Sequence, residues 1–377
     1  MRLHTKATVQ VNNEDRGAIL TVDLGAIAKN YETLRSKVGE SECAAVVKAN
    51  AYGLGVEQIA PVLWQAGCRV FFVATFEEGA QLRHLIPEAA EIAVLNGLVP
   101  NAIQDYNKAN LVPVLNDLAE IENLSAIAKR TERNQTAMIH CDTGMNRLGL
   151  DAKSVNIISE NPKKLAGIDI CGVMSHLACA EEQHHPYNAM QQNRFKNALS
   201  LLPASRASLA NSSGVFLGSH YHFDMVRPGI ALYGVNPTPG QLNPMREAVS
   251  IKARALQIRN IDSSQTVGYG ATHRFSSPRI IATISIGYAD GLPHSLSNNG
   301  HVAIKDKSVP IIGRVSMDTC SIDISSLPSD SFKVGDTVTI VGQTRPLESL
   351  AQEANTIPYE ILTRLGPRLG HIYLPRQ

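Results

Sequence analysis

The chain has 377 residues, enough for two domains, and its 44% hydrophobic content allows a sizeable core. A formal net charge of +1 gives no electrostatic reason to expect a nucleic acid or an anionic membrane as partner. No apolar run could span a bilayer, and residues 1–20 lack the apolar segment of a signal peptide, so we expect a cytoplasmic protein. The six scattered cysteines form no CxxC pair, and we interpret them as reduced core residues.

Eight short apolar runs between about residue 20 and residue 235 alternate with stretches in which apolar residues recur at helical spacing. The runs cover residues 44–48, 70–76, 92–97, 111–116, 136–142, 168–177, 207–212 and 225–234. Nearly continuous apolar strands separated by helices are typical of a parallel sheet covered on both faces. We therefore predict an α/β fold with a (β/α)8 TIM barrel over residues 14–245.

After residue 245 the pattern changes to strand-like runs joined by short polar links, which predicts a C-terminal all-β domain over residues 246–377. The runs cover residues 250–258, 279–287, 301–305, 309–317, 320–325 and 337–342. A short helix is expected near residues 348–355. Residues 1–13 contain the alternating stretch TVQV, a candidate for one more strand of this domain. We interpret the cluster Arg364, Arg368 and His371 as part of a solvated tail.

The first predicted barrel strand runs into Lys48, within the sequence VVKANAYGLG. In barrels of this kind, functional groups collect where strands end at the C-terminal face. A lysine there has two interpretations. The more frequent is a surface amine whose stem covers apolar surface. The other is a partly desolvated amine whose lowered pKa lets it attack a carbonyl, such as the aldehyde of pyridoxal phosphate (PLP).

Two further segments, NSSG at residues 211–214 and RPGI at residues 227–230, follow the seventh and eighth predicted strands. Phosphate sites of barrels commonly form at this place. Gly229 allows a close approach of the backbone, and Ser212 offers a hydroxyl. An ordinary strand-to-helix turn with a serine cap is the alternative for NSSG.

Together with CDTGMNRLG, VGYGAT, SIGYADG, GRVSMD and IPYE, these segments resemble the alanine racemase family, PLP enzymes that interconvert L- and D-alanine. The motifs lie in the expected order from residue 46 to residue 360, so the resemblance covers nearly the whole chain. It implies alanine as substrate, a role in supplying D-alanine for peptidoglycan, and a homodimer. In that dimer the β-domain of one subunit completes the site of the other.

The resemblance also implies two catalytic bases on opposite faces of the substrate: Lys48, which carries PLP, and Tyr269 from the partner's β-domain. His176 is implied to link that tyrosine to Arg227, which faces the pyridine nitrogen. An arginine stays cationic and cannot accept the pyridinium proton, whereas a carboxylate there would indicate a decarboxylase or an aminotransferase. For Tyr269, His176 and Arg227 the alternative is a purely structural role, as a packed or salt-bridged side chain.

The remaining site residues are likewise implied by the resemblance. Arg147 is expected to contact the phenolic oxygen of PLP and the substrate carboxylate. Met317 is expected to touch the substrate beside Asp318, with Tyr288 at the entrance. The phosphate is expected to bind among Tyr52, Asn211, Ser212, Gly229, Ile230 and Tyr359.

One position departs from the family pattern. His140 stands where the family often carries a carbamylated lysine that steadies the arginine corresponding to Arg147, so we expect activity that does not depend on bicarbonate. His184 and His185, with His176, lie at no convincing ligand spacing, and no metal site is expected. The alternatives are a broader-range racemase, a PLP decarboxylase, which Arg227 argues against, or a non-catalytic PLP-binding protein, which the β-domain argues against.

Overall fold

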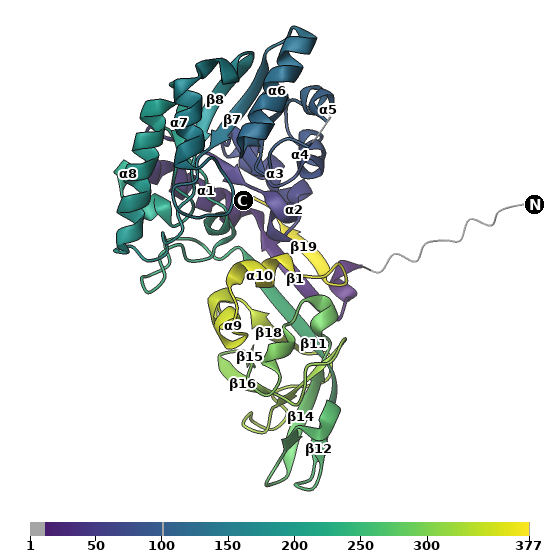
Figure 1. The fold of residues 1–377 in the computed structure, drawn as a ribbon. Helices are drawn as coiled ribbons and strands as arrows, with labels where there is room; N and C mark the ends of the chain where they lie inside the picture. Colours follow the sequence, from purple (N-terminus) through teal and green to yellow (C-terminus); the bar gives the residue numbers. More distant parts are fainter. Residues whose placement is uncertain (1–11, 100–101, 377) are drawn as a thin grey trace, which may run out of the picture. The chain divides into compact units, whose positions relative to one another are not determined.

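The computed structural model describes residues 12–99 and 102–376, and these form two compact units (Figure 1). Of the described residues, one unit comprises those of Leu24–Arg246 together with Arg376, and the other comprises those up to Asp23 together with Glu247–Pro375. Each unit has its own sheet and its own buried hydrophobic side chains. The TVQV stretch, a candidate strand in the sequence, lies outside the described residues.

The first unit is built on a nine-stranded sheet in which every neighbouring pair is parallel. Its strands are β2 (Glu42–Cys43), β3 (Ala45–Val46), β4 (Val70–Val73), β5 (Glu91–Val94), β6 (Leu111–Leu115), β7 (Gln135–His140), β8 (Ile168–Met174), β9 (Arg206–Ser208) and β10 (Met225–Val226). Each of the eight runs predicted from the sequence overlaps one of these strands. Several of the strands, such as β4 and β6, are buried at every residue, as expected for a sheet covered on both faces.

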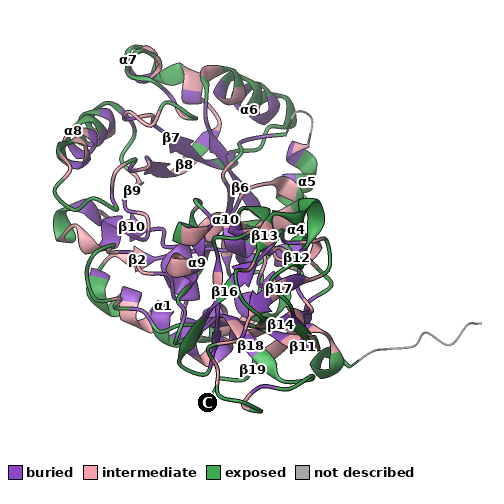
Figure 2. Cartoon of the chain, turned by 90° about the horizontal axis from the view of Figure 1, so that it is seen from below, coloured by how far each residue is buried: buried purple, intermediate pink, exposed green. Residues whose placement is uncertain are grey.

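The two ends of this sheet meet within one segment of chain. β2 and β3 are separated only by Ala44; β2 pairs with β10, and β3 pairs with β4. The segment therefore closes the sheet into a barrel, and Figure 2 shows β6, β7, β8, β9, β10 and β2 following one another around a ring. The predicted (β/α)8 barrel is confirmed.

Helices surround the barrel strands in the order expected from the sequence (Figure 1). They are α1 (Leu24–Val38), α2 (Lys48–Tyr52), α3 (Val56–Gln65), α4 (Phe76–Arg83), α5 (Ile103–Lys108), α6 (Leu118–Thr131), α7 (Ala152–Glu160) and α8 (Pro186–Leu201). Four of them begin at side-chain caps: the side-chain oxygens of Thr75, Asp117 and Asp151 and a ring nitrogen of His185 accept otherwise unpaired backbone N–H groups. Between β9 and β10, and again after β10, the connections are short 3-10 turns instead: η3 (Gly214–Phe216), η4 (Ser219–Tyr221) and η5 (Ile230–Tyr233).

The second unit contains an eight-stranded sheet in the order β14-β17-β16-β15-β18-β11-β1-β19. The strands are β1 (Ala18–Asp23), β11 (Val249–Ile261), β14 (Arg279–Ile284), β15 (His301–Ile304), β16 (Lys307–Ile312), β17 (Cys320–Asp323), β18 (Thr337–Val341) and β19 (Gly370–Leu374). The long strand β11 pairs with β1, β14 and β18 and so connects the two halves of the sheet. β12 (Thr266–Val267) and β13 (His273–Arg274) form a separate hairpin. The predicted β-domain is confirmed, and it also carries the helices α9 (Leu347–Glu353) and α10 (Pro358–Thr363).

The boundary near residue 14 falls differently in the structure. β1 pairs antiparallel with β11 and parallel with β19, so residues 18–23 belong to the sheet of the second unit. Burial alternates along β1, which fits a strand with one solvated face rather than an element of the barrel. The other boundary, expected after residue 245, follows Arg246.

The solvated tail predicted for Arg364, Arg368 and His371 is wrong for His371, which lies half-buried in β19 and pairs with β1. Arg364 and Arg368 are exposed, but Arg368 also binds two carboxylates of the second unit. No local pattern indicates that β1 is the partner strand of this segment.

All six cysteines are unpaired, and Cys43, Cys68, Cys141 and Cys320 are buried, as predicted for core residues; Cys171 and Cys179 are half-buried. Among the described residues, no helix combines the length and the apolar character needed to cross a bilayer.

Candidate functional site

Lys48 begins a turn of unusual handedness directly after the first barrel strand. Although the turn forms a helical hydrogen-bond pattern, Ala49, Asn50, Ala51 and Tyr52 have φ angles of 52°, 55°, 52° and 57°. The turn is therefore left-handed and ends at Gly53, whose φ is 81°. Each non-glycine residue in this conformation costs about 1–2 kcal/mol, so other contacts must stabilise the turn.

Glu78, from α4, supplies the main contacts to this turn. Its Oε1 accepts the backbone N–H of Ala49 at 2.7 Å, and its Oε2 accepts the N–H of Ala74, at the end of β4, also at 2.7 Å. One carboxylate therefore joins the start of the turn to the neighbouring strand end. Asn50 adds a second link, because its Oδ1 accepts the N–H of Val56 at 2.8 Å. Hydrogen bonds to a charged group contribute about 1.5–3 kcal/mol each, which is comparable to the strain.

The half-buried amine of Lys48 has a lowered pKa. Burial is the main cause, the positive charge of Arg147 adds to it, and the carboxylate of Glu78 opposes it. A lower pKa increases the fraction of neutral amine near pH 7, and only the neutral amine is a nucleophile or a base. The interpretation as an ordinary surface lysine is therefore not supported.

The segments predicted to form a phosphate cradle meet at the ends of β9 and β10. The buried Oγ of Ser212 accepts the backbone N–H groups of Gly229, at 2.9 Å, and Ala231, at 3.3 Å, at the start of η5. A Cβ on residue 229 would lie 2.3 Å from the Tyr52 hydroxyl and 3.3 Å from the Cβ of Val46. Only glycine fits here, and the close approach brings the last barrel strand against the turn that follows Lys48.

Three other predicted members of this cradle, Tyr52, Asn211 and Ile230, lie in the same unit. Tyr52 stacks at a tilt against Tyr233, with ring centroids 4.9 Å apart, and the Tyr233 hydroxyl donates to the carbonyl of Val46 at 3.0 Å. Asn211 shapes the loop, because its Oδ1 accepts the N–H of Gly214 at 2.9 Å. Ile230 is buried as the first residue of η5.

Arg227 and His176 form a buried pair in the same unit. Arg227 is 3% exposed; its guanidinium donates to Ser208 Oγ at 2.5 Å, to the Ser175 carbonyl at 2.6 Å and to His176 Nδ1 at 3.3 Å. A guanidinium can only donate, so Nδ1 of His176 accepts, and the proton of the neutral ring lies on Nε2.

Electrostatics keep these two groups in fixed charge states. Burial lowers the pKa of Arg227 to about 9, which leaves the guanidinium cationic at neutral pH. Burial first, and then the positive charges of Arg227 and Arg147, hold the pKa of His176 well below its ordinary value. His140 and Lys48 act in the same direction. Arg227, Arg147, His140 and Lys48 therefore all lie close enough to His176 to influence its charge state.

Arg147 lies in the exposed part of a loop that is ordered by Asp142. The Asp142 carboxylate accepts the N–H groups of Gly144, at 2.9 Å, and Asn146, at 3.1 Å. The hydroxyl of Tyr187, on α8, donates to the Gly144 carbonyl at 2.7 Å. The backbone of this loop is fixed, while the guanidinium of Arg147 is left exposed.

His140, at the end of β7, is held by Asn116, at the end of β6. Its Nδ1 lies 2.8 Å from Asn116 Oδ1. The Asn116 amide nitrogen already donates to the carbonyls of Leu95 and Val114, so Oδ1 must accept and Nδ1 of His140 carries the proton. Burial first, and then Arg227, lower the pKa of His140 to about 4. The residue is therefore a neutral imidazole whose Nε2 has no partner among the described residues.

The remaining predicted residues lie in the second unit. Tyr269 begins η6 (Tyr269–Ala271) and is 70% exposed, Met317 is 52% exposed, and Tyr288, at the start of η7 (Tyr288–Asp290), is 45% exposed. Asp318 pairs with Arg368 at 2.5 Å. Tyr359 lies half-buried on α10.

The histidines of the polar loop have a local role. His185 caps α8, because its Nδ1 accepts the N–H of Tyr187 at 3.1 Å. Within residues 12–99 and 102–376, no group of three or more His, Cys, Asp or Glu side chains is placed to hold a metal ion.

Three contributors were missed in the sequence: Glu78, Asn116 and Ser208. Glu78 could have been found, because Thr75 and Glu78 have the Thr-x-x-Glu spacing of a capping box just after a predicted strand. The N–H groups of Ala74 and Ala49 that its carboxylate binds are not part of that pattern. Asn116 and Ser208 carry no local signal, since their partners come from other strands.

Comparison with known proteins identifies the family of the chain. Residues 22–237 match the family described as alanine racemase, N-terminal domain, and residues 248–373 match alanine racemase, C-terminal domain. The chain is 45% identical over 365 residues to the alanine racemase of Rhodospirillum rubrum, covering 96% of this chain and 98% of that protein.

Two solved structures are similar over the whole fold. Alanine racemase from Bartonella henselae with covalently bound pyridoxal phosphate is 44% identical, with a TM-score of 0.92, over 95% of this chain and 99% of that one. Biosynthetic alanine racemase from Pseudomonas aeruginosa is 32% identical, with a TM-score of 0.89, over 96% of this chain and 100% of that one.

Fold and site together define a class: enzymes in which a (β/α)8 barrel, with a lysine of lowered pKa after its first strand, is followed by a β-domain. Both family matches and the relatives cover nearly the full length. The chain belongs to the alanine racemase family. This disfavours a non-catalytic protein made of a single barrel.

Proposed function

We propose that this chain interconverts L- and D-alanine by proton transfer at Cα, with pyridoxal phosphate as cofactor. The observation that carries the proposal is the amine of Lys48, which has a lowered pKa and begins a strained turn held against the Ser212–Gly229 cradle. Membership of the alanine racemase family supports both the reaction and the cofactor.

The residues present fit the cofactor. Because Ser212 Oγ accepts the N–H groups of Gly229 and Ala231, its own hydroxyl hydrogen is left to donate to a phosphate, and the N–H of Ile230 could add a second donor. The absent side chain of residue 229 leaves room beside Tyr52, and Asn211 holds the adjoining turn. Tyr359 is proposed as a further phosphate ligand. When bound, pyridoxal phosphate supplies an electron sink that acidifies the α-proton of the attached amino acid.

Arg227 is proposed to face the pyridine nitrogen. Its guanidinium carries only donors and remains cationic, so it could donate a hydrogen bond to that nitrogen but could not accept a proton from it. An arginine at this position would make the bound cofactor a weaker electron sink, which would favour racemisation over transamination or decarboxylation. This is the reason to prefer a racemase over the decarboxylase considered from the sequence.

Two bases are needed because the proton leaves one face of Cα and returns to the other. Lys48 is proposed to serve one face and Tyr269 the other. A phenol has a pKa near 10, so its anion needs a donor. His176 has its proton on Nε2 while Arg227 binds Nδ1, and it can therefore donate to a phenolate without becoming charged itself. Arg147 is proposed to bind the substrate carboxylate and the phenolic oxygen of the cofactor.

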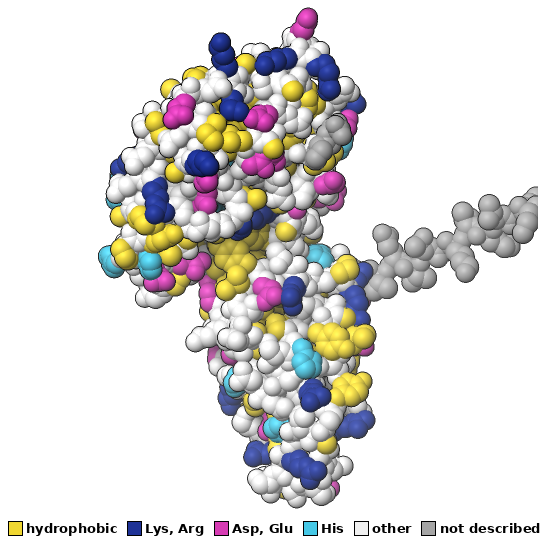
Figure 3. Space-filling view, viewed as in Figure 1, with side chains coloured by type: hydrophobic (Ala, Val, Ile, Leu, Met, Phe, Trp, Pro, Cys, Tyr) yellow, Lys and Arg dark blue, Asp and Glu magenta, His cyan; other side chains and the backbone are white. Residues whose placement is uncertain are grey.

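The sites are proposed to be shared in a homodimer. Tyr269, Met317 and Tyr288 are large side chains that lie 70%, 52% and 45% exposed on the second unit. Figure 3 shows hydrophobic side chains, in yellow, among the charged side chains on the visible face of this unit. Exposed apolar groups of this kind mark interaction surfaces. In the proposed dimer they would complete the site on the barrel of the partner, with Met317 touching the substrate.

The cellular role is proposed to be the supply of D-alanine for peptidoglycan in the cytoplasm, which fits six unpaired cysteines. Purified protein with pyridoxal phosphate should convert L-alanine to D-alanine in D2O, with deuterium entering Cα. Lys48→Ala should abolish this exchange, and exchange retained in that variant would refute the mechanism. Serine and larger amino acids, tested in parallel, distinguish an alanine racemase from a broader-range racemase.

The shared sites can be tested by mixing two inactive variants. In a hybrid dimer of Lys48→Ala and Tyr269→Phe chains, one site has both defects and the other has none. Random reassortment should restore about a quarter of wild-type activity, because about half of the dimers are hybrids with one working site of two. No recovery after verified subunit exchange would refute sharing of Lys48 and Tyr269 between chains.

A further inference from the structure

Two loops of the second unit carry Tyr288 and Met317, and they are joined by their backbones. The N–H of Tyr288 donates to the Ser316 carbonyl at 3.1 Å, and the N–H of Ala289 donates to the Met317 carbonyl at 3.0 Å. A Cβ on residue 287 would lie 2.3 Å from that Met317 carbonyl oxygen, so glycine is required for the contact. The two loops, residues 287–291 and 316–318, therefore form one layer.

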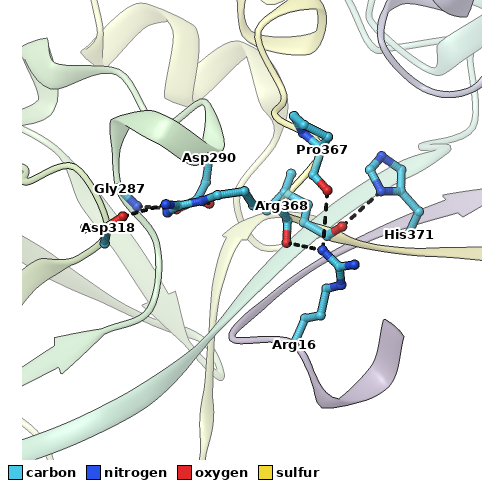
Figure 4. A network of polar contacts seen from close by, with 8 residues as sticks. Arg16, Gly287, Asp290, Asp318, Pro367, Arg368 and His371 are labelled. Carbon is cyan, nitrogen blue, oxygen red and sulfur yellow. Dashed lines mark hydrogen bonds and ion pairs between the residues drawn. The ribbon is translucent and has the colours of Figure 1, made fainter. Parts of the chain in front are cut away.

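Arg368 clamps this layer (Figure 4). Its Nε and Nη2 donate to the two carboxylate oxygens of Asp290 at 2.8 and 3.0 Å, and its Nη1 donates to Asp318 Oδ1 at 2.5 Å. Asp290 is 5% exposed, and its Oδ2 also accepts the N–H of Gly287 at 2.9 Å. One guanidinium thus holds both loops. It binds Asp290, two residues after Tyr288, and Asp318, the residue after Met317.

The base of this clamp is itself fixed. Figure 4 shows Arg16 reaching the backbone of the same segment; its Nη1 donates to the carbonyls of Arg368, at 3.0 Å, and Pro367, at 3.4 Å. The N–H of Gly366 donates to the carbonyl of Asp290 at 3.1 Å, and β19 begins two residues after Arg368. The guanidinium therefore projects from a segment held on both sides.

The ion pair between Arg368 and Asp318 is exposed, so its main effect is on the geometry of the two loops and not on the stability of the fold. Arg368 and Asp318 have side chains 47% and 62% exposed, and ion pairs of this kind contribute little to folding. The same fork nevertheless sets the distance between the loops, because a planar guanidinium binds two carboxylates only in a fixed arrangement. A lysine would keep the charge beside Asp290 and lose this arrangement.

We propose that Arg368 is a positioning residue that sets the size of the substrate pocket by fixing Met317 and Tyr288 together. The inference rests on the proposed function, in which these two side chains line the substrate space of the partner subunit. Loosening the clamp leaves the chemical groups in place and weakens the closure around a methyl-sized side chain.

The test compares Arg368→Lys with a matched control, Arg345→Lys. Arg345 makes an equally bidentate pair with Glu353, at 2.9 and 2.7 Å, elsewhere in the same unit. In Arg368→Lys the KM for alanine should rise about tenfold with kcat within about twofold, and the ratio of kcat/KM for serine to that for alanine should rise. Arg345→Lys should lower the thermal midpoint and leave both KM and that ratio unchanged.

Hydrogen exchange provides a readout that does not depend on activity. Backbone amides of residues 287–291 and 316–318 should exchange faster in Arg368→Lys than in the wild type. In Arg345→Lys these amides should exchange at the wild-type rate. Equal exchange in Arg368→Lys and wild type, an unchanged KM, or the same change in the control would overturn the inference. A wild-type protein that does not racemise alanine would instead refute the proposed function, and the exchange experiment would still decide whether Arg368 clamps the loops. If Arg368→Lys does not fold, Asp318→Asn is measured in the same way and should show the same changes.

Discussion

The left-handed turn after Lys48 should depend on Glu78. Replacing Glu78 by Gln keeps one carbonyl oxygen for one backbone N–H, but it places an NH2 group against the other. One of the two 2.7 Å bonds, to Ala49 or Ala74, is lost and the other loses its charge. At about 1.5–3 kcal/mol for each charge-assisted bond, the total loss is about 3 kcal/mol.

Four non-glycine residues in the left-handed region carry about 4–8 kcal/mol of strain, so the weakened turn should relax when no cofactor is bound. Only the fraction of molecules with the turn formed can bind, and a loss of about 3 kcal/mol then raises the apparent Kd for pyridoxal phosphate up to about 150-fold. The Kd is measured by absorbance titration of protein stripped of its cofactor. A Kd within about twofold of the wild type would refute the reasoning.

Two further variants sharpen this test. Asp151→Ala removes the cap of α7, where Asp151 accepts the N–H of Ser154 at 2.7 Å, and it should cost about 1 kcal/mol of stability without changing the Kd. Ala49→Gly, combined with Glu78→Gln, should recover affinity severalfold, because glycine adopts the left-handed conformation without the steric cost.

Three other outcomes are expected. Gly229→Ala should raise the Kd for pyridoxal phosphate by about 5- to 150-fold, since its Cβ would force Tyr52 aside at a cost of about 1–3 kcal/mol; an unchanged Kd, measured by the same titration, would contradict the cradle. Adding bicarbonate to decarbonated enzyme should leave kcat unchanged, because His140 cannot be carbamylated; a severalfold rise would show that another group is carbamylated. Burial lowers the pKa of His140 from 6.5 to about 4, so protons bind the unfolded state preferentially and stability should fall as pH drops from about 6.5 to about 4, by up to roughly 3 kcal/mol. Urea unfolding against pH should show a smaller acid loss in His140→Gln, and an identical slope would contradict this assignment.

The barrel could be predicted because its strands are short apolar runs with a simple repeat. β4 and β6 are buried at every residue, and the sequence shows this directly. β1 was assigned to the wrong unit because its partners β11 and β19 lie more than two hundred residues away. Which distant strand a short alternating segment joins is decided by pairing, and the local pattern does not contain that information.

The candidate site was predictable to a similar extent. Lys48, Ser212, Gly229 and Arg227 lie in motifs at strand ends, and the fold brings them into one unit. The handedness of the turn after Lys48 was not predictable, because Ala49, Asn50 and Ala51 are not residues that local rules place in the left-handed region, with the partial exception of asparagine. Contacts from Glu78 and the chain geometry overrule the local preference there.

A bound ligand would also stabilise the barrel at its seam, the junction where the first strand segment, β2 and β3, meets the last strand, β10. The closing strands are very short: β2, β3 and β10 have two residues each, so few backbone hydrogen bonds fasten the first strand to the last. The amine of Lys48 belongs to one side of that seam and the amide of Gly229 to the other. A molecule attached to both would cross-link this seam, so losing it should loosen the barrel there before the longer β7–β8 pair opens.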